Sequence, residues 1–569
     1  MSDLIERARR WIATDPDPAT RAELEAVIDS GDVDELTSRL VTALEFGTAG
    51  IRGAVGAGPG RMNRAVVIRT TYGLARYLHE HEEGDQPGRV VLGFDARPDS
   101  RQFAEDTAGV LAAAGIPVVY FPMVTPTPLV AFAAKHLSAS AAVVVTASHN
   151  PPADSGYKVY GPNWAQIVSP IDVEIQNAIA EAPGATQIDR VEGVFTGSSA
   201  IVRPIDENIL DCYWEEVAAT RSRKAGSALQ VVYTPMHGVG RDVVLEVMQR
   251  AGHTGVVAVP EQAEPDGRFP TVEFPNPEEP GALDLALDLA RQRSAALILA
   301  NDPDADRLAA VVPGGGDWRP LSGNEIGALL GDYMLRNDPN PRESIVVSSI
   351  VSSPLLAAIA ASYGARHEQT LTGFKWIVRA GLALEASTGG RFIFGYEEAL
   401  GYTVGSTVRD KDGISAALLF TDMAADLEDS KRSVIDYLHD LWRAHGLWVS
   451  GQTSITRTGP EGVESLREAI DRLGDEPPED LDGIPVVAIT DYRSGGSERP
   501  DWLGEQALIE LNIGEMGRLL VRPSGTEPKL KIYVDLREDP GDELDSQHTA
   551  LEERAARLGH GLAASLGFS

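Results

Sequence analysis

Short apolar runs rich in β-branched residues alternate with amphipathic stretches in the first part of the chain. The runs at 89–94, 117–121 and 141–145 have the length and composition of buried strands. Helical stretches separate them, and Asp99 or Ser100 is the expected N-cap of the first. This strand–helix alternation favours a mostly parallel sheet covered by helices.

The same alternation recurs in two further regions. The second contains three expected strands and a helix, at 229–233, 256–259, 295–300 and 283–293. The third contains two expected strands and a helix, at 345–348, 391–394 and 354–363. We therefore predict three related domains, each with a mixed α/β sheet.

The two ends of the chain differ from this pattern. Residues 5–44 are predicted to be helical, with Asp32 as an N-cap and Glu35 placed as in a capping box. Beyond about residue 447, strands are expected close together and a terminal helix follows, at 486–490, 507–511, 517–521, 529–534 and 545–566. That arrangement is typical of an α+β domain. The predicted domains are 1–208, 209–320, 321–446 and 447–569.

Composition agrees with several domains and narrows the choice of partners. At roughly 100–200 residues per domain, 569 residues correspond to about three to five domains. A hydrophobic content of 43% and a charged content of 24% are those of a soluble globular protein. The net charge of −34 argues against nucleic acid or an anionic membrane as a partner. An anionic substrate would need Arg and Lys residues concentrated in one cleft.

Other features predict a cytoplasmic location. No run approaches the roughly 18 apolar residues of a membrane span. The acidic N-terminus does not resemble a secretory signal. Cys212 is the only cysteine, so no internal disulfide can form, which suits a reducing compartment. We expect a monomer or a small homo-oligomer.

One stretch, Thr146-Ala147-Ser148-His149-Asn150-Pro151, combines a hydroxyl with an abrupt end to a strand. It follows the apolar run at 141–145, and the prolines after Asn150 end regular structure. Ser148 is thereby placed at the carboxyl end of a strand, where open α/β sheets bind ligands. The alternative is an ordinary serine in a turn.

A second stretch carries three alternating carboxylates, Asp302, Asp304 and Asp306. On a loop they can converge on one cation, and hard oxygen ligands in this number suit Mg²⁺. An EF-hand is excluded, because Arg307 stands where that loop needs Gly and Pro313 where it needs Glu. A solvated acidic turn is the remaining alternative.

Further stretches offer contacts for a phosphorylated, hydroxyl-rich ligand. Glu397 and Glu398, in the run 395–401, are suitable acceptors for sugar hydroxyls. The segment from Arg522 through Ser524, Gly525 and Thr526 supplies a guanidinium, hydroxyls and accessible backbone N–H groups for a phosphate. The three glycines of the run 46–53 permit close backbone approach. Lys375, in the run 372–375, is a weaker candidate contact. Solvated turns and surface loops are the alternatives.

Together the motifs at 146–151, 302–307, 395–401 and 522–529 resemble, in order and spacing, the α-D-phosphohexomutase superfamily of phosphoglucomutases and phosphomannomutases. The resemblance extends from about Phe46 to near the C-terminus. It implies an α/β fold of four domains around a central cleft, namely three related mixed-sheet domains and a C-terminal α+β domain.

The resemblance also implies roles for particular residues. Ser148 would be phosphorylated, and its phosphoryl oxygen would complete the Mg²⁺ site. Arg307 would face the transferring phosphoryl group, and Arg52 would contact phosphate. Lys158 would assist as a general acid or base, with its pKa lowered by neighbouring cations.

His149 follows Ser148 directly. The surrounding residues do not form a nucleophile elbow. Side chains that follow one another on an extended segment point apart, so a Ser–His relay is not expected. Contact with phosphate or help with proton transfer is the expected role of His149.

The sugar loop departs from the usual pattern. Tyr396 stands at the expected Gly and Ala399 at the expected Ser, so one hydroxyl contact to the sugar is lost. With the N-terminal extension, this variant resembles the branch that includes phosphopentomutase-active members.

We therefore predict an enzyme, an intramolecular phosphotransferase that interconverts hexose 1-phosphate and hexose 6-phosphate of glucose, mannose or both. The route would use a phosphoserine, Mg²⁺ and a bisphosphorylated sugar of the glucose 1,6-bisphosphate type as primer. The alternative substrate is ribose or deoxyribose phosphate. A phosphoserine-dependent sugar phosphatase and a catalytically silent sugar-phosphate sensor are alternatives of other classes.

Overall fold

The computed structural model describes residues 1–47, 50–81, 88–196, 199–457, 459–496, 499–524 and 529–568. The chain divides into two units: residues 1–320 with 402–422, and residues 321–401 with 423–569. Strand β15 (Gly401–Val404) and helix α14 (Gly413–Asp429) lie where the chain passes between them.

The N-terminal extension is helical, as predicted. It comprises α1 (Ser2–Ile12), α2 (Pro18–Ser30) and α3 (Val33–Leu40). Asp32 caps α3, because its carboxylate accepts the N–H of Glu35 at 3.0 Å. Leu24, Leu36 and Ala57 share a small buried cluster that joins the extension to the next domain.

The first sheet has the strand order β1-β5-β4-β2-β3-β6. Its strands are β1 (Ile51–Ala54), β2 (Val90–Phe94), β3 (Val118–Tyr120), β4 (Ala141–Val145), β5 (Asp154–Tyr160) and β6 (Val202–Pro204). Strands β4, β2, β3 and β6 run parallel, whereas β5 returns antiparallel to β4. Strands β2 and β4 are buried along their whole length because helices cover both faces of the sheet.

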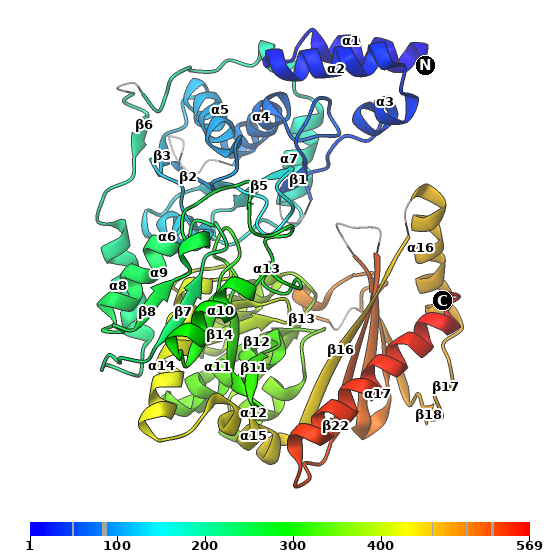
Figure 1. Cartoon of the computed structure of the whole chain (residues 1–569). Coiled ribbons are helices and arrows are strands. Elements are labelled where there is room, and N and C mark those ends of the chain that lie inside the picture. The colour runs from blue at the N-terminus through cyan, green and yellow to red at the C-terminus, as the bar shows by residue number, and fades with distance from the viewer. Residues whose placement is uncertain are drawn as a thin grey trace. The chain divides into compact units, whose positions relative to one another are not determined.

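Four helices accompany this sheet: α4 (Arg64–Glu80), α5 (Ser100–Ala113), α6 (Thr127–His136) and α7 (Ile171–Ala180). Helices α5 and α6 pack against β2 and β4 from opposite faces (Figure 1). Asp99 is the N-cap of α5, as predicted, but its side chain forms no capping hydrogen bond. The hydroxyl of Ser100 donates to Asp95 Oδ1 at 2.6 Å.

The second sheet, also in the first unit, has the order β11-β10-β9-β7-β8. Its elements are α8 (Ile209–Thr220), β7 (Val231–Thr234), α9 (Arg241–Arg250), β8 (Val256–Ala258), α10 (Asp284–Arg293), β9 (Leu297–Ala300), β10 (Ala309–Gly314) and β11 (Asp317–Pro320). The predicted strands β7, β8 and β9 pair in parallel, and the unpredicted β10 and β11 add an antiparallel hairpin.

The second unit begins with a sheet in which β12 lies between β13 and β14, both parallel to it. Its elements are α11 (Gly323–Asn337), β12 (Ser344–Ser349), α12 (Leu355–Tyr363), β13 (Arg366–Thr370), α13 (Phe374–Thr388), β14 (Arg391–Glu397) and α15 (Val434–His445). The unpredicted β13 is charged and only half-buried, which explains why no apolar run marks it.

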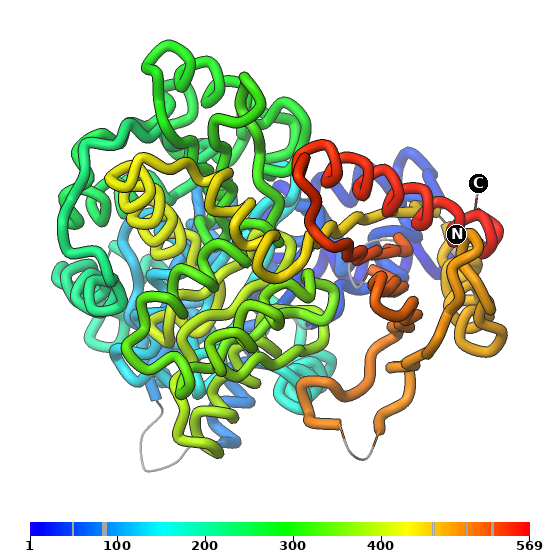
Figure 2. Tube along the Cα trace, turned by 90° about the horizontal axis from the view of Figure 1, so that it is seen from below, coloured from blue at the N-terminus to red at the C-terminus, as the bar shows by residue number. Residues whose placement is uncertain are grey.

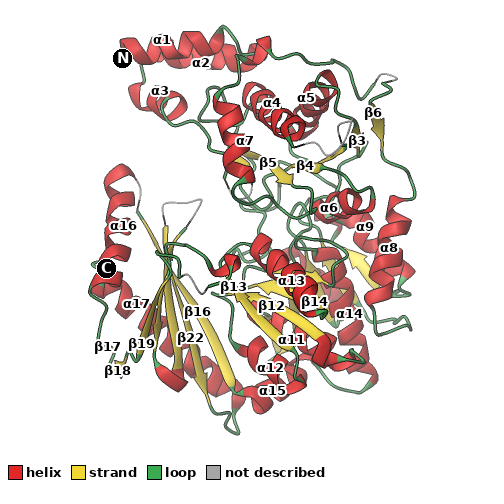
Figure 3. Ribbon diagram, turned by 180° about the vertical axis from the view of Figure 1, so that it is seen from behind, coloured by secondary structure: helices red, strands yellow, loops and turns green. Residues whose placement is uncertain are grey.

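The last sheet is antiparallel, in the order β16-β22-β21-β20-β19 (Figure 3). Its elements are β16 (Leu447–Thr456), α16 (Gly459–Asp475), β17 (Asp480–Leu481), β18 (Ile484–Pro485), β19 (Ala488–Asp491), β20 (Ile509–Asn512), β21 (Gly517–Pro523), β22 (Lys529–Glu538) and α17 (Leu544–Ser565). Helix α17, red in Figure 2, packs along β16 and β22.

Short 3₁₀ turns complete the described structure, at Ala185–Gln187, Pro260–Gln262, Pro341–Glu343, Asp501–Leu503 and Gly514–Met516.

Segment 402–422 is held in the first unit by buried ionic contacts. Asp422 accepts two hydrogen bonds from the Arg221 guanidinium, at 2.7 and 2.8 Å, and lies 2.8 Å from His253 Nε2. The Tyr213 hydroxyl donates to Asp412 at 2.9 Å. These contacts hold segment 402–422, which includes Lys411, in the first unit.

We expect Asp422→Ala to destabilise the first unit by about 3–5 kcal/mol, because it leaves the buried Arg221 guanidinium without its partner. Urea unfolding followed by circular dichroism would measure the loss. Asp288→Ala, which removes an exposed ion pair with Arg291, is the control and should leave the unfolding midpoint unchanged. Equal midpoints for both variants would contradict the assignment.

Candidate active site

Ser148 lies in the tight connection between β4 and β5. Strand β4 ends at Val145, and the backbone N–H of Ser148 donates to Thr146 Oγ1 at 2.9 Å. Ser148 adopts a left-handed conformation with φ of 52° and is 1% exposed. Strand β5 pairs antiparallel with β4, and Lys158 on β5 lies opposite Val144 on β4.

The three aspartates follow β9 and are completely buried. Ala305 has φ of 57°, which turns the loop back so that Asp302, Asp304 and Asp306 face one another. One carboxylate oxygen from each lies within 4.8 Å of the others. Asp302 Oδ2 accepts the hydroxyl of Ser148 at 2.6 Å. The fold therefore brings the predicted nucleophile to the predicted metal ligands.

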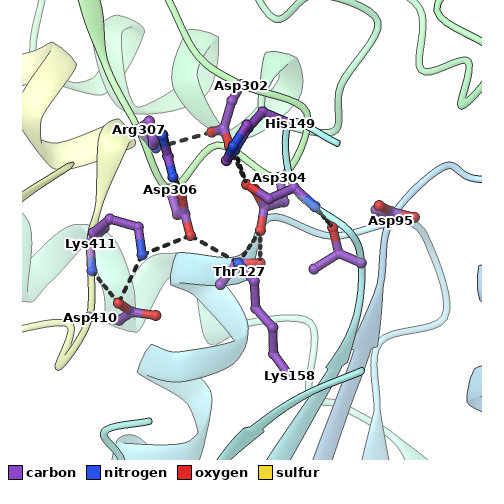
Figure 4. Close-up of polar contacts among 12 residues, drawn as sticks. Asp95, Thr127, His149, Lys158, Asp302, Asp304, Asp306, Arg307, Asp410 and Lys411 are labelled. Carbon is purple, nitrogen blue, oxygen red and sulfur yellow. Dashed lines mark hydrogen bonds and ion pairs between the residues drawn. The ribbon is translucent and has the colours of Figure 1, made fainter. Parts of the chain in front are cut away.

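Two ammonium groups contact one carboxylate oxygen of Asp304 and one of Asp306. Lys158 Nζ donates to Asp304 Oδ2 at 2.6 Å and to Asp306 Oδ2 at 2.9 Å. Lys411 Nζ lies 3.2 Å from Asp306 Oδ2, and Thr127 Oγ1 donates to Asp304 Oδ2 at 2.6 Å (Figure 4). Among the described residues, the second oxygens, Asp304 Oδ1 and Asp306 Oδ1, have no hydrogen-bond partner although both are buried.

This arrangement fits a divalent cation. Buried carboxylate oxygens without a partner are unfavourable unless something satisfies them. Here two such oxygens belong to a group of three carboxylates that approach within 4.8 Å of one another, and oxygen donors are the ligands that Mg²⁺ prefers. Because Lys158 occupies Oδ2 of both Asp304 and Asp306, their Oδ1 atoms are left for an ion.

The pKa values of the three carboxyl groups shift in different directions. Burial would raise the pKa of Asp304, but the Lys158 ammonium and the hydrogen bonds from Lys158 and Thr127 hold this pKa well below its usual range. Burial and the charge of Asp304 would raise the pKa of Asp306, yet the two lysines lower it. The pKa of Asp302 is raised, by burial and by the other two carboxylates.

The expected lowering of the Lys158 pKa is wrong for this arrangement. Burial does favour the neutral amine, but Asp304 and Asp306 outweigh it and raise the pKa of Lys158. Lys158 is therefore a buried ammonium that compensates the carboxylates. Its neighbours in the chain, Gly156, Tyr157 and Val159, carry no charge and do not indicate anionic contacts.

The expectation that Ser148 and His149 point apart is also wrong. It assumed an extended segment, whereas the left-handed φ of Ser148 turns the chain and leaves Ser148 Oγ 3.2 Å from His149 Nδ1. Burial, together with the positive charges of Arg307 and Arg52, lowers the pKa of His149 well below its ordinary value. A neutral imidazole therefore lies beside the hydroxyl.

Two arginines border the same site. Arg307 donates its backbone N–H to Asp302 Oδ1 at 3.1 Å, and its Nε lies 3.9 Å from Asp306 Oδ1. Arg52 lies on β1 opposite Gly156, and its charge acts on both His149 and Lys158. Its buried Nε has no hydrogen-bond partner among the described residues.

The second unit holds the remaining predicted contacts. Glu398 follows Glu397, the last residue of β14, and its Oε2 accepts the Ser349 hydroxyl at 3.0 Å. Arg522 Nη2 donates to the Tyr533 hydroxyl at 3.3 Å. The pKa of Tyr533 is raised by burial and by the negative charge of Glu398, so Arg522 and Glu398 share this neighbour.

Lys375 and Ser524 lie elsewhere in that unit. Lys375 is the second residue of α13, is 6% exposed, and has its Nζ 5.3 Å from the Trp376 ring. Ser524 follows β21 and donates its N–H to the carbonyl of Lys529 at 2.7 Å. The predicted contacts Gly525 and Thr526 fall outside the described residues.

Sequence reasoning missed several residues of the first-unit site, above all Lys411. The neighbouring Asp410 accepts the Tyr160 hydroxyl at 2.6 Å and lies 3.3 Å from Lys411 Nζ. A signal was present: the charged run 409–412 directly precedes the apolar start of α14. Charged residues next to a buried helix start must be paired or functional.

The chain matches family models for all four domains of phosphoglucomutase/phosphomannomutase: α/β/α domain I at 43–184, domain II at 211–315, domain III at 322–445 and the C-terminal domain at 488–545. The chain belongs to this family. Its members are phosphomutases, which are isomerases. The match confirms the predicted superfamily and the predicted fold class of three α/β domains with a C-terminal domain.

Individual relatives of the chain are also named as phosphomutases. Over 488 residues the chain is 39% identical to "Probable phosphomannomutase" of Haemophilus influenzae, which covers 84% of this chain and 94% of that protein. Over 589 residues it is 35% identical to the phosphopentomutase of Homo sapiens, covering 97% and 95%. Parafusin, a phosphoglucomutase from Paramecium solved in an open form, shares the fold, with a TM-score of 0.66, 17% identity and coverage of 92% and 96%.

Among the described residues, no helix combines the length and the apolar character needed to cross a membrane.

We expect Asp304→Asn to weaken Mg²⁺ binding by at least about tenfold, or about 1.4 kcal/mol, because it removes the charge from a buried oxygen ligand. Titration calorimetry on protein first treated with a chelator would measure the affinity. Asp317→Asn, on the exposed end of β11, is the matched control. An unchanged affinity in the Asp304 variant would remove the aspartate cluster as the ion site.

Proposed function

We propose that this protein interconverts hexose 1-phosphate and hexose 6-phosphate, of glucose, mannose or both, through a phosphoserine at Ser148. The observation that carries the proposal is the 2.6 Å hydrogen bond from the Ser148 hydroxyl to Asp302, inside a cluster of three buried aspartates. A serine held against a cation site is suited to carry a phosphoryl group. Membership of a phosphomutase family supports the same chemistry.

In the first half-reaction a sugar hydroxyl attacks the phosphorus of phosphoserine 148. The bond from phosphorus to the new sugar oxygen forms while the bond to Ser148 Oγ breaks. The hydroxyl proton finally resides on Ser148 Oγ, and the neutral ring of His149, 3.2 Å away, is placed to pass it on. The product is a bisphosphorylated sugar. After it reorients, its other phosphate returns to Ser148 by the reverse exchange.

Electrostatic stabilisation comes from the cations of the site. Mg²⁺, when bound to Asp302, Asp304 and Asp306, would polarise the phosphoryl oxygens. Arg307 and Arg52 supply guanidinium groups for the equatorial charge. Lys158 acts in this proposal by holding Asp304 and Asp306 in place, since its own contacts keep it protonated.

The second unit is proposed to bind the sugar and its second phosphate. Glu397 and Glu398 would accept hydrogen bonds from sugar hydroxyls. Arg522 and Lys375 would bind the phosphate that is not being transferred, together with Ser524, Gly525 and Thr526 in the same loop.

A pentose phosphate is the second candidate substrate. Two observations favour it. Tyr396, at the position where the family loop usually has Gly, is fully buried, so its side chain offers no new contact to a sugar. The phosphopentomutase relative covers nearly the whole chain, including the N-terminal extension. Phosphoserine-dependent phosphatase activity would use the same residues but transfer the phosphoryl group to water. Both alternatives have direct assays.

We expect Ser148→Ala to lower mutase turnover by at least about 10³-fold while the fold survives, because the covalent step is lost. A coupled assay with Mg²⁺ and a glucose 1,6-bisphosphate primer gives the rate, and circular dichroism checks the fold. Ser138→Ala, at an exposed position between α6 and β4 of the same domain, is the control and should keep full turnover. Near-wild-type turnover in the Ser148 variant would rule out a phosphoserine route.

The substrate is decided by comparing glucose 1-phosphate, mannose 1-phosphate and ribose 1-phosphate in that assay. We expect kcat/KM to be highest for a hexose phosphate. A ribose 1-phosphate value about tenfold higher, equivalent to about 1.4 kcal/mol of transition-state binding, would establish the pentose alternative instead. Release of inorganic phosphate faster than isomer formation would identify a phosphatase.

A further inference from the structure

We propose that Arg97 is the positioning residue that holds Ser148 in its reactive conformation. Arg97 touches neither the aspartate cluster nor the Ser148 hydroxyl in any contact of the described structure. Its hydrogen bonds to the loop that carries Ser148 all go to backbone carbonyls. The inference rests on the proposed function, because it takes Ser148 as the group that is phosphorylated.

The guanidinium of Arg97 donates to four carbonyl groups of one loop. Nη2 donates to the carbonyls of Ser148 at 2.8 Å and Asn150 at 2.7 Å. Nη1 donates to those of Pro151 at 2.6 Å and Asp154 at 2.8 Å. One planar group therefore gathers the backbone from Ser148 to the start of β5 around itself.

Such a clamp is needed because the loop is otherwise unfavourable. Serine rarely adopts a left-handed φ, so the value of 52° at Ser148 has to be imposed by its surroundings. Carbonyls that point into a buried turn also need donors. Arg97 supplies those donors from a single rigid fork, which a lysine ammonium on a flexible stem cannot reproduce.

Arg97 itself is fixed from several sides. It is 3% exposed, and its Nε lies 3.2 Å from Asp95 Oδ2, while Asp95 Oδ1 accepts its backbone N–H at 3.0 Å. The buried ring of Phe269, from the second sheet's domain, lies 5.1 Å from the guanidinium carbon. The N–H of Gly267 donates to the carbonyl of Ala96 at 3.2 Å. Arg97 is thus locked before it contacts the loop, as a residue that sets geometry must be.

A cavity borders the clamp and makes it testable. Its volume is about 210 Å³, and Arg97, Pro98, Pro152 and Ser155 are among its lining residues. Truncating Arg97 would open this cavity toward the four carbonyls. A free guanidinium ion could then occupy the vacated position and donate to them.

The experiment compares Arg97→Ala and Arg97→Lys with the wild type, in the assay with Mg²⁺, primer and whichever of the three sugar 1-phosphates is turned over fastest. We expect kcat to fall by about 10²-fold, the loss typical of a reacting group displaced by about 1 Å. The KM for the sugar phosphate and the affinity for Mg²⁺ should stay within about twofold, because the residues proposed to bind them are untouched.

Rescue separates positioning from general destabilisation. Low millimolar guanidinium chloride should raise the kcat of Arg97→Ala by at least about tenfold. Methylammonium should not, since it lacks the planar fork of N–H donors. Arg101→Ala is the matched control: Arg101 is the second residue of α5, is exposed, and has its described contacts with Pro122, Phe94 and Phe195. Its kcat should equal that of the wild type with and without guanidinium.

The outcomes are distinct. The clamp would be overturned by a wild-type kcat in Arg97→Lys, or by a loss of activity that lies in KM or in Mg²⁺ affinity. In either case an inactive Ser148→Ala variant would leave the phosphoserine route standing. Activity in Ser148→Ala would remove the proposed function and the clamp together. If Arg97→Ala does not fold, Arg97→Lys decides: a kcat loss of at least about tenfold at unchanged KM supports the clamp.

Discussion

Three carboxylates buried next to one another repel, and the first unit is arranged to compensate that repulsion. Lys158 and Lys411 oppose Asp304 and Asp306, whereas burial and the two neighbouring carboxylates raise the pKa of Asp302. A buried cluster of this kind costs free energy unless each charge has a partner. The Oδ1 atoms of Asp304 and Asp306, which have no hydrogen-bond partner among the described residues, are what remains of that cost, and their chemistry fits a cation.

The partners come from distant parts of the chain. Lys158 is delivered by the β4–β5 hairpin of the first sheet, the aspartates by the loop after β9 of the second, and Lys411 by segment 402–422, which lies beyond the first three strands of the third region. Buried pairs such as Arg221 with Asp422 keep that segment in the first unit. Compensation of the aspartate cluster therefore depends on the tertiary structure of the whole unit.

The same site explains why two residues behave differently from what their neighbours in sequence indicate. Lys158 is surrounded by Gly, Tyr and Val in the chain, yet in space its neighbours are carboxylates that keep it charged. His149 follows Ser148, and only the left-handed backbone at Ser148 brings their polar atoms to 3.2 Å. Protonation and geometry at this site are thus properties of the fold.

The sequence alone determined the strand–helix order, the placing of Ser148 after β4 and the alternation of Asp302, Asp304 and Asp306, because periodicity, proline positions and ligand chemistry are local. Strands β13 and β16 escaped prediction because most of their residues are polar or only half-buried. Only the tertiary structure decided that Asp302 meets Ser148, that Lys411 joins Asp306 and that Arg97 grips the Ser148 loop. Each of these contacts joins residues far apart in the chain, and their pairing follows from packing and burial, which no local pattern encodes.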